Sequence, residues 1–300
     1  MRGGAPTRRE RGLWSMCRLA AFIGDLRAAP GELHAFRQLA VRNPDGYGVG
    51  GFIDGAATIR KSAMSALDDP DFGLEPFADG ARSAIVHLRK ATVGNVSASN
   101  THPFDMGDRI IAHNGTVADV GGLEALIGAA GMRRMGVVGD TDSERLAAYL
   151  ALLSERAGGD TVAGYRLLAR ELAERQPMTS LTSLTVASNG DVFALRYPEN
   201  RSLFWKRLGV RDAAAGHRAL DGGGRGEATV LASRPMGVRD GWNELMPGQV
   251  LHVRAHDLSE EVTTIARVEP RLRLVDRHVD EGARWTGPRR SRMVEADLSA

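Results

Sequence analysis

The order of its predicted elements constrains the fold of this 300-residue chain more than any other feature. Apolar, β-branched runs predict strands on both sides of a central segment, where leucines three and four residues apart predict helices. Two tight-turn dipeptides, Asp54-Gly55 and Asn189-Gly190, separate neighbouring strand-like runs, which is typical of antiparallel hairpins. Because strands and helices are segregated rather than alternating, the pattern favours an α+β protein over a doubly wound α/β fold.

The predicted strands lie before and after the helical segment. Strands are expected at residues 17–24, 47–52, 57–59, 83–88 and 109–113, and again at 183–187, 192–196, 229–233 and 249–254. Helices are expected at residues 30–42, after Thr141 with Leu146, Leu150 and Leu153 in one apolar stripe, and near 161–174. The glycine-rich segment 211–228 predicts a mobile loop.

Both ends of the chain differ in composition from its middle. Residues 1–16 are polar and arginine-rich, contain no apolar run that fits a secretory signal, and are predicted to be a disordered leader. Residues 17–256 are predicted to form one domain, followed by a weakly ordered extension at 257–300.

Charge and cysteine content exclude several classes of function. The 39 basic and 37 acidic residues leave a net charge of +2, too little for a general nucleic-acid surface, and no run of about 18 apolar residues could span a membrane. The single cysteine, Cys17, excludes internal disulfides and zinc sites with several thiolates, so a reducing cytoplasm is the expected location. A small-molecule substrate is therefore expected.

Familiar cofactor motifs are missing or out of context. Gly46, Gly48 and Gly51 match the spacing of a dinucleotide loop, but a strand and turn follow them instead of the required helix. The sequence has no Walker loop, no G-x-S-x-G elbow and no H-E-x-x-H helix. No metal or organic cofactor is expected.

Seven short motifs follow one another in a fixed order. They are Met16-Cys17-Arg18, Asn43-Pro44-Asp45-Gly46-Tyr47-Gly48, His87-Leu88-Arg89-Lys90-Ala91-Thr92, Asn100-Thr101-His102-Pro103-Phe104, Ala112-His113-Asn114-Gly115, Asp140-Thr141-Asp142-Ser143-Glu144 and Ala232-Ser233-Arg234-Pro235. Over residues 17–255 this set resembles the class II glutamine amidotransferase domain, a family of N-terminal-nucleophile hydrolases. The resemblance implies a four-layer αββα sandwich of two antiparallel sheets.

Two positions depart from the family pattern. Lys90 stands where many members have an aromatic residue, and Arg18 replaces the glycine common in the large synthase-linked enzymes. The chain is therefore more similar to the compact, stand-alone branch, which includes enzymes that act on γ-glutamyl amides in ergothioneine biosynthesis.

The resemblance assigns the nucleophile to Cys17. A thiol is a suitable nucleophile near neutral pH, and an α-amino group with a pKa of about 7.7 is a matched general base. The resemblance implies that Cys17 is the first residue of the mature chain and supplies both groups. Translation from Met16 with methionine removal, cleavage of a propeptide, or loss of activity are the three alternatives for residues 1–16.

The resemblance also assigns substrate contacts. Asn114 and Gly115 are expected to hold the oxyanion, although an Asn-Gly pair after a strand is also typical of a simple turn. Arg89 is expected to bind the α-carboxylate and Asp142 the α-ammonium, with Thr92 and His102 lining the pocket. Arg89 could instead be a surface charge, and Asp142 could be a helix N-cap or do both.

The predicted reaction is hydrolysis of glutamine or a γ-glutamyl compound through a thioester, releasing ammonia or an amine. A separate synthase subunit is a possible acceptor. The alternatives are a γ-glutamyl amide hydrolase of an ergothioneine-like pathway, an acylase-like amidase that needs no amino-acid head, and a non-catalytic protein that retains the leader.

Overall fold

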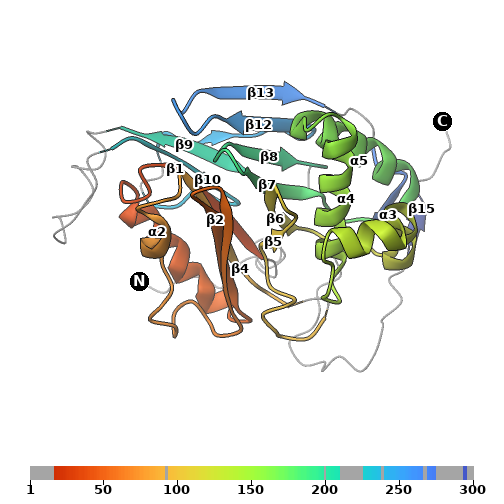
Figure 1. The fold of residues 1–300 in the computed structure, drawn as a ribbon, viewed down its shortest axis with the longest axis horizontal. Coiled ribbons are helices and arrows are strands. Elements are labelled where there is room, and N and C mark those ends of the chain that lie inside the picture. Colours follow the sequence, from red (N-terminus) through yellow and green to blue (C-terminus); the bar gives the residue numbers. More distant parts are fainter. Residues whose placement is uncertain are drawn as a thin grey trace, which may run out of the picture.

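A computed structural model describes residues 17–91, 94–198, 201–209, 226–237, 240–265, 269–274 and 293–295. Two antiparallel sheets are stacked face to face within this part of the chain (Figure 1). The predicted leader, residues 1–16, and most of the predicted glycine-rich loop lie outside the described residues. The α+β fold with two antiparallel sheets is confirmed.

The seven-stranded sheet has the order β11-β9-β10-β1-β4-β2-β3. Its strands are β1 (Arg18–Gly24), β2 (Tyr47–Ile53), β3 (Ala56–Ser62), β4 (Ser83–Leu88), β9 (Phe204–Leu208), β10 (Ala228–Ala232) and β11 (Asn243–Glu244). β1 lies in the interior of this sheet, between β10 and β4.

The six-stranded sheet has the order β13-β12-β8-β7-β6-β5. Its strands are β5 (Phe104–Asp105), β6 (Arg109–Asn114), β7 (Thr182–Ala187), β8 (Val192–Arg196), β12 (Gln249–Val253) and β13 (Glu260–Thr264). β13 lies past the domain boundary predicted at residue 256, and the division into domain and extension stays a prediction. A small separate pair joins β14 (Leu272–Leu274) to β15 (Met293–Glu295).

The helices cover the two outer faces of the sheets. They are α2 (Pro30–Arg37), α3 (Val120–Arg134), α4 (Asp142–Arg156) and α5 (Thr161–Arg175), with 3₁₀ turns at Gln38–Arg42 and Glu75–Phe77. In β1, Ala20 and Phe22 pack with Phe36 of α2, whereas Leu19 and Ala21 face the other sheet. The resulting order is helix, sheet, sheet, helix, the sandwich that the resemblance implied.

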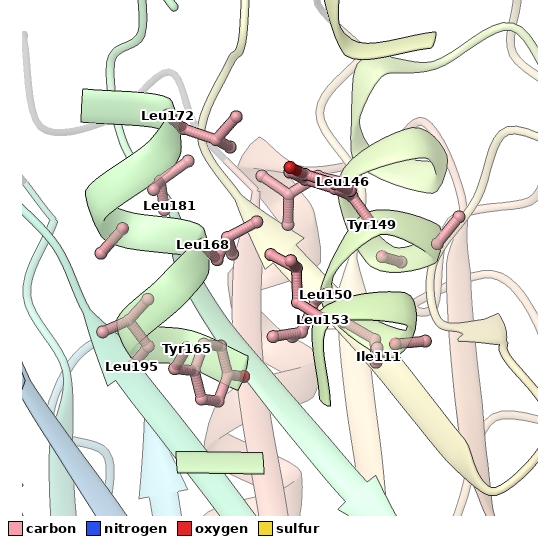
Figure 2. Close-up of a cluster of buried hydrophobic side chains, with 14 of the residues drawn as sticks. Ile111, Leu146, Tyr149, Leu150, Leu153, Tyr165, Leu168, Leu172, Leu181 and Leu195 are labelled. Carbon is pink, nitrogen blue, oxygen red and sulfur yellow. The ribbon is translucent and has the colours of Figure 1, made fainter. Parts of the chain in front are cut away.

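The largest helical core lies on the six-stranded sheet. The predicted stripe Leu146, Leu150 and Leu153 of α4 meets Leu168 and Leu172 of α5 there (Figure 2). Burying such leucines contributes roughly 2 kcal/mol each. This core packs α4 against the six-stranded sheet, so the first residues of α4 lie next to the end of β6.

Two helical predictions need correction. The helix expected at 30–42 is α-helical only to Arg37 and then tightens into a 3₁₀ turn. Helix α3 was not predicted, because four glycines interrupt its sequence and Gly128 leaves helical geometry at φ 74°. None of the described helices is long and apolar enough to cross a membrane.

Candidate active site

Three of the predicted site residues, Cys17, Arg89 and Asn114, lie where the two sheets end. β1 starts directly after Cys17, β4 ends directly before Arg89, and β6 ends at Asn114. Because Arg18 pairs with Leu88, Cys17 and Arg89 are the next residues outward on adjacent strands. The side-chain nitrogen of Asn114 donates a hydrogen bond to the Cys17 carbonyl oxygen at 3.1 Å and so connects the two sheets.

The Cys17 thiol lies against the backbone that follows β4. The Lys90 N–H donates to Sγ at 3.3 Å, and the thiol donates to the Lys90 carbonyl oxygen at 3.5 Å. Burial raises the pKa of the Cys17 thiol, while the Lys90 N–H and the charges of Arg89 and Arg18 oppose that rise. The thiol is therefore held in place and needs a base to become a thiolate.

Gly115 lies where a side chain has no room. A Cβ atom at this position would be 2.1 Å from the Ser180 carbonyl oxygen and 2.7 Å from Nε2 of His113. Asn114 pairs with Thr182 inside the sheet, and the chain continues to Val117, which bridges Met178. Asn114 is therefore the last residue of β6 and the chain bends at Gly115 directly after it, so both the oxyanion role and the turn after a strand stay predictions.

Arg89 is buried, so its alternative as a surface charge is wrong. Its side chain is 3% exposed, and its Nη1 donates to the Asn95 carbonyl oxygen at 3.0 Å. Burial lowers the pKa of Arg89, and the neighbouring Cys17 and Asp45 oppose that change. A buried guanidinium beside the thiol is suited to binding a carboxylate.

Asp142 is the first residue of α4 and not its N-cap. Thr141 has extended backbone angles, and its hydroxyl accepts a hydrogen bond from the Glu144 N–H at 3.3 Å, so it is the cap. The buried Asp142 carboxylate accepts from the Val117 N–H at 2.8 Å. Burial raises the pKa of Asp142, opposed first by His113 and then by that N–H. The N-cap alternative for Asp142 is thus wrong.

His102 lies in a buried aromatic stack. Its ring centroid is 4.2 Å from that of His87 and 4.7 Å from that of Phe104, and it is 5% exposed. Within the described part of the chain, the ring nitrogens of His87 and His102 have no hydrogen-bond partner. Burial lowers the pKa of both imidazoles, that of His87 to about 3, so both rings are neutral at physiological pH. Thr92, the other predicted pocket residue, lies outside the described residues.

Several contacts at the site involve residues without a predicted role. His113 bonds to Ser143 Oγ at 3.0 Å and to the Ser180 carbonyl oxygen at 2.8 Å, which ties β6 to α4. Only its place in the Ala112-His113-Asn114-Gly115 motif could have signalled this. Among the described residues, no group of three or more His, Cys, Asp or Glu side chains could hold a metal ion.

Known proteins are similar in sequence to part of this chain. Two curated relatives, both named glutamine–fructose-6-phosphate aminotransferase (isomerizing), come from Gluconobacter oxydans and Caulobacter vibrioides. The first is 29% identical over 39% of this chain and 19% of its own length, and the second 31% identical over 44% and 21%. The chain thus spans about a fifth of the length of these relatives.

Solved structures share the fold. The glutamine phosphoribosylpyrophosphate amidotransferase of Bacillus subtilis superposes with a TM-score of 0.58 and 17% identity, over 86% of this chain and 51% of that one. A glutamine aminotransferase class-II domain protein from Silicibacter pomeroyi gives 0.55 and 18%, over 83% of this chain and 100% of that one.

The family model for class II glutamine amidotransferases matches residues 16–273, which include both sheets and every predicted site residue. This chain therefore belongs to the class II glutamine amidotransferases, enzymes that act on amide C–N bonds.

Proposed function

We propose that this chain hydrolyses the side-chain amide of glutamine, or of a γ-glutamyl compound, through a thioester on Cys17. The contact between Cys17 and Asn114, 97 residues apart in sequence, carries the proposal. It brings the expected nucleophile and the expected oxyanion donor together at the ends of two different sheets.

In the first step the Cys17 thiolate attacks the amide carbon, and the carbonyl oxygen becomes negative. A carboxamide has two N–H groups, so Asn114 can hold the Cys17 carbonyl with one and the oxyanion with the other. The Gly115 N–H is the second proposed donor. The C–N bond then breaks, and the nitrogen leaves as ammonia or an amine with the proton taken from the thiol.

In the second step water attacks the thioester, which releases the γ-carboxyl product and restores the thiol. The base for both steps is the α-amino group of Cys17, because burial raises the thiol pKa and an amine with a pKa of about 7.7 can accept its proton near neutral pH. In the 300-residue sequence this nitrogen is a peptide nitrogen. The proposed active form therefore starts at Cys17.

The amino-acid head of the substrate is proposed to lie between Arg89 and Asp142. Arg89 would take the α-carboxylate and Asp142 the α-ammonium, with Thr92 and His102 at the pocket wall. Released ammonia would pass to a synthase on a separate chain.

Glutaminase assays on two forms of the chain test the proposal. The form that starts at Cys17 should release glutamate and ammonia, whereas the 300-residue form and Cys17→Ala should not. A glutamine-mimicking electrophile, diazo-oxo-norleucine, should label Cys17, and glutamine should protect it. Equal turnover by the 300-residue form, or full activity of Cys17→Ala, would contradict the proposal.

A further inference from the structure

A single buried carboxamide connects the two sides of the proposed substrate pocket. Asn100 lies in the segment between β4 and β5 and is 2% exposed. Its side-chain oxygen accepts from the Asp140 N–H at 2.9 Å, and its side-chain nitrogen donates to the Asn95 carbonyl oxygen at 3.3 Å. Both partners are backbone groups, so the contacts fix the paths of two loops.

Each of these loops carries a proposed head-group ligand. The Asn95 carbonyl oxygen that accepts from Asn100 also accepts from the Arg89 guanidinium at 3.0 Å. On the other side, Asp140 is followed by the cap Thr141 and then by Asp142. Asn100 and Arg89 therefore share one acceptor, the Asn95 carbonyl oxygen. The other partner of Asn100, Asp140, lies two positions before Asp142 in the sequence.

The packing around the carboxamide leaves it little freedom. A Cβ atom on Gly94 would be 2.9 Å from the side-chain nitrogen of Asn100, and one on Gly139 would be 2.7 Å from its oxygen. Glu144 fixes the same loop from α4, because its carboxylate accepts from the Gly139 N–H at 2.7 Å and the Val138 N–H at 3.2 Å. The two glycines bring the loops within reach of one short side chain.

We infer that Asn100 is a positioning residue that sets the separation between Arg89 and Asp142, and thereby selects substrates with both an α-carboxylate and an α-ammonium. The inference rests on the proposed function. Binding a zwitterionic head requires a cation and an anion at a matching distance, and that distance depends here on the two loops. A carboxamide is required because one contact needs an acceptor and the other a donor.

Asn100→Asp is the sharpest test. The carboxylate can still accept from the Asp140 N–H, but it cannot donate to Asn95 and places negative charge against a carbonyl oxygen. In the form that starts at Cys17, KM for glutamine should rise about tenfold or more, with a smaller change in kcat. Asn189→Asp is the matched control, since this exposed side chain only accepts from the Asp191 N–H, as a carboxylate also can, and its KM should not change.

Truncated substrates separate positioning from general damage. Glutaramic acid, the monoamide of glutaric acid, lacks the α-ammonium, and 4-aminobutanamide lacks the α-carboxylate, so neither needs the matched spacing. Asn100→Asp should therefore lose activity toward glutamine while its turnover of both truncated amides stays near that of the parent. A uniform loss toward all three substrates would overturn the inference.

Folding and function are checked separately. Thermal unfolding shows whether Asn100→Asp is folded. If it is not folded, the same kinetic test is made on Asn100→Ala, which removes both contacts without adding a charge. If the parent enzyme hydrolyses glutamine and the variant has the same KM, the inference is wrong and the proposed function is unaffected. A parent form without any amidase activity would instead count against the proposed function.

Discussion

The side-chain amide of Asn114 donates to the backbone carbonyl of Cys17 across the gap between the two sheets. A bond of this kind fixes the distance between the proposed nucleophile and the proposed oxyanion donor before substrate arrives. Such preorganisation is the feature that makes oxyanion stabilisation effective.

Replacing Asn114 by Ala should therefore act on the chemical step. We expect kcat for glutamine hydrolysis to fall by about 10²–10³, with little change in KM, since the lost donor matters when negative charge develops. Steady-state kinetics of the form that starts at Cys17 measure this. Asn189→Ala, in the other Asn-Gly pair, is the control, and its kcat should not change. A rise in KM without a fall in kcat for Asn114→Ala would argue against an oxyanion role.

Gly115→Ala should be poorly tolerated for a steric reason. Its Cβ atom would be 2.1 Å from the Ser180 carbonyl oxygen, and a backbone atom cannot turn aside as a flexible side chain can. We expect a loss of about 1–3 kcal/mol in the free energy of unfolding, together with loss of activity. Urea denaturation tests this against Gly31→Ala, where no atom lies within 4 Å of the added Cβ. Equal stability of the two variants would show that the site can relax.

Asp142→Asn should weaken binding of the substrate head. The amide oxygen can still accept from the Val117 N–H, so the local fold is kept, but the charge that pairs with an α-ammonium is lost. We expect KM for glutamine to rise roughly 10- to 100-fold, as for a charge-assisted hydrogen bond worth about 1.5–3 kcal/mol. Asp160→Asn at the cap of α5 serves as control. The assignment fails if the hydrolysis of glutaramic acid, which lacks the ammonium, is affected as strongly as that of glutamine.

The buried imidazole pair predicts that stability falls on acidification. The folded-state pKa of His87 is about 3, below the unfolded value of about 6.5, so between these values only the unfolded state binds the proton. Above pH about 6.5 this ring therefore does not lower the free energy of unfolding. As pH falls from there toward 3, the free energy of unfolding decreases by up to ~1.4 kcal/mol per pH unit for each such ring. Burial acts on His102 in the same direction.

Denaturant unfolding at pH 7 and pH 5 measures this dependence. His87→Leu removes one titrating ring, so the difference between the two pH values should shrink. His34→Gln, at an exposed position, is the matched control variant. An unaltered pH dependence in His87→Leu would mean that other groups cause the acid sensitivity.

Elements with a clear hydrophobic period could be predicted from the sequence, and those without one could not. Residues 83–88 form β4 with the predicted bounds, and the leucine stripe of α4 is buried as expected. Strands β5 and β11 have two residues each, too few to show alternation. Helix α3 is held by packing despite its glycines, which local propensity does not reveal.

The site was predictable at the level of residue types but not of contacts. The motifs brought Cys17, Arg89 and Asn114 into one site, yet the thiol is held by the backbone of Lys90, which no side-chain pattern encodes. The cap of α4 was misplaced by one residue, because Thr141 and Asp142 are both good cap residues and only backbone angles distinguish them.

The interior place of β1 has a practical consequence. Strands β10 and β4 flank β1 on both sides, so Cys17, directly before β1, lies at the middle of a sheet end, in contact with Asn114. An affinity tag or fusion partner joined to Cys17 would convert the proposed catalytic α-amino group into a peptide nitrogen. Handles for purification or surface immobilisation belong elsewhere on the protein.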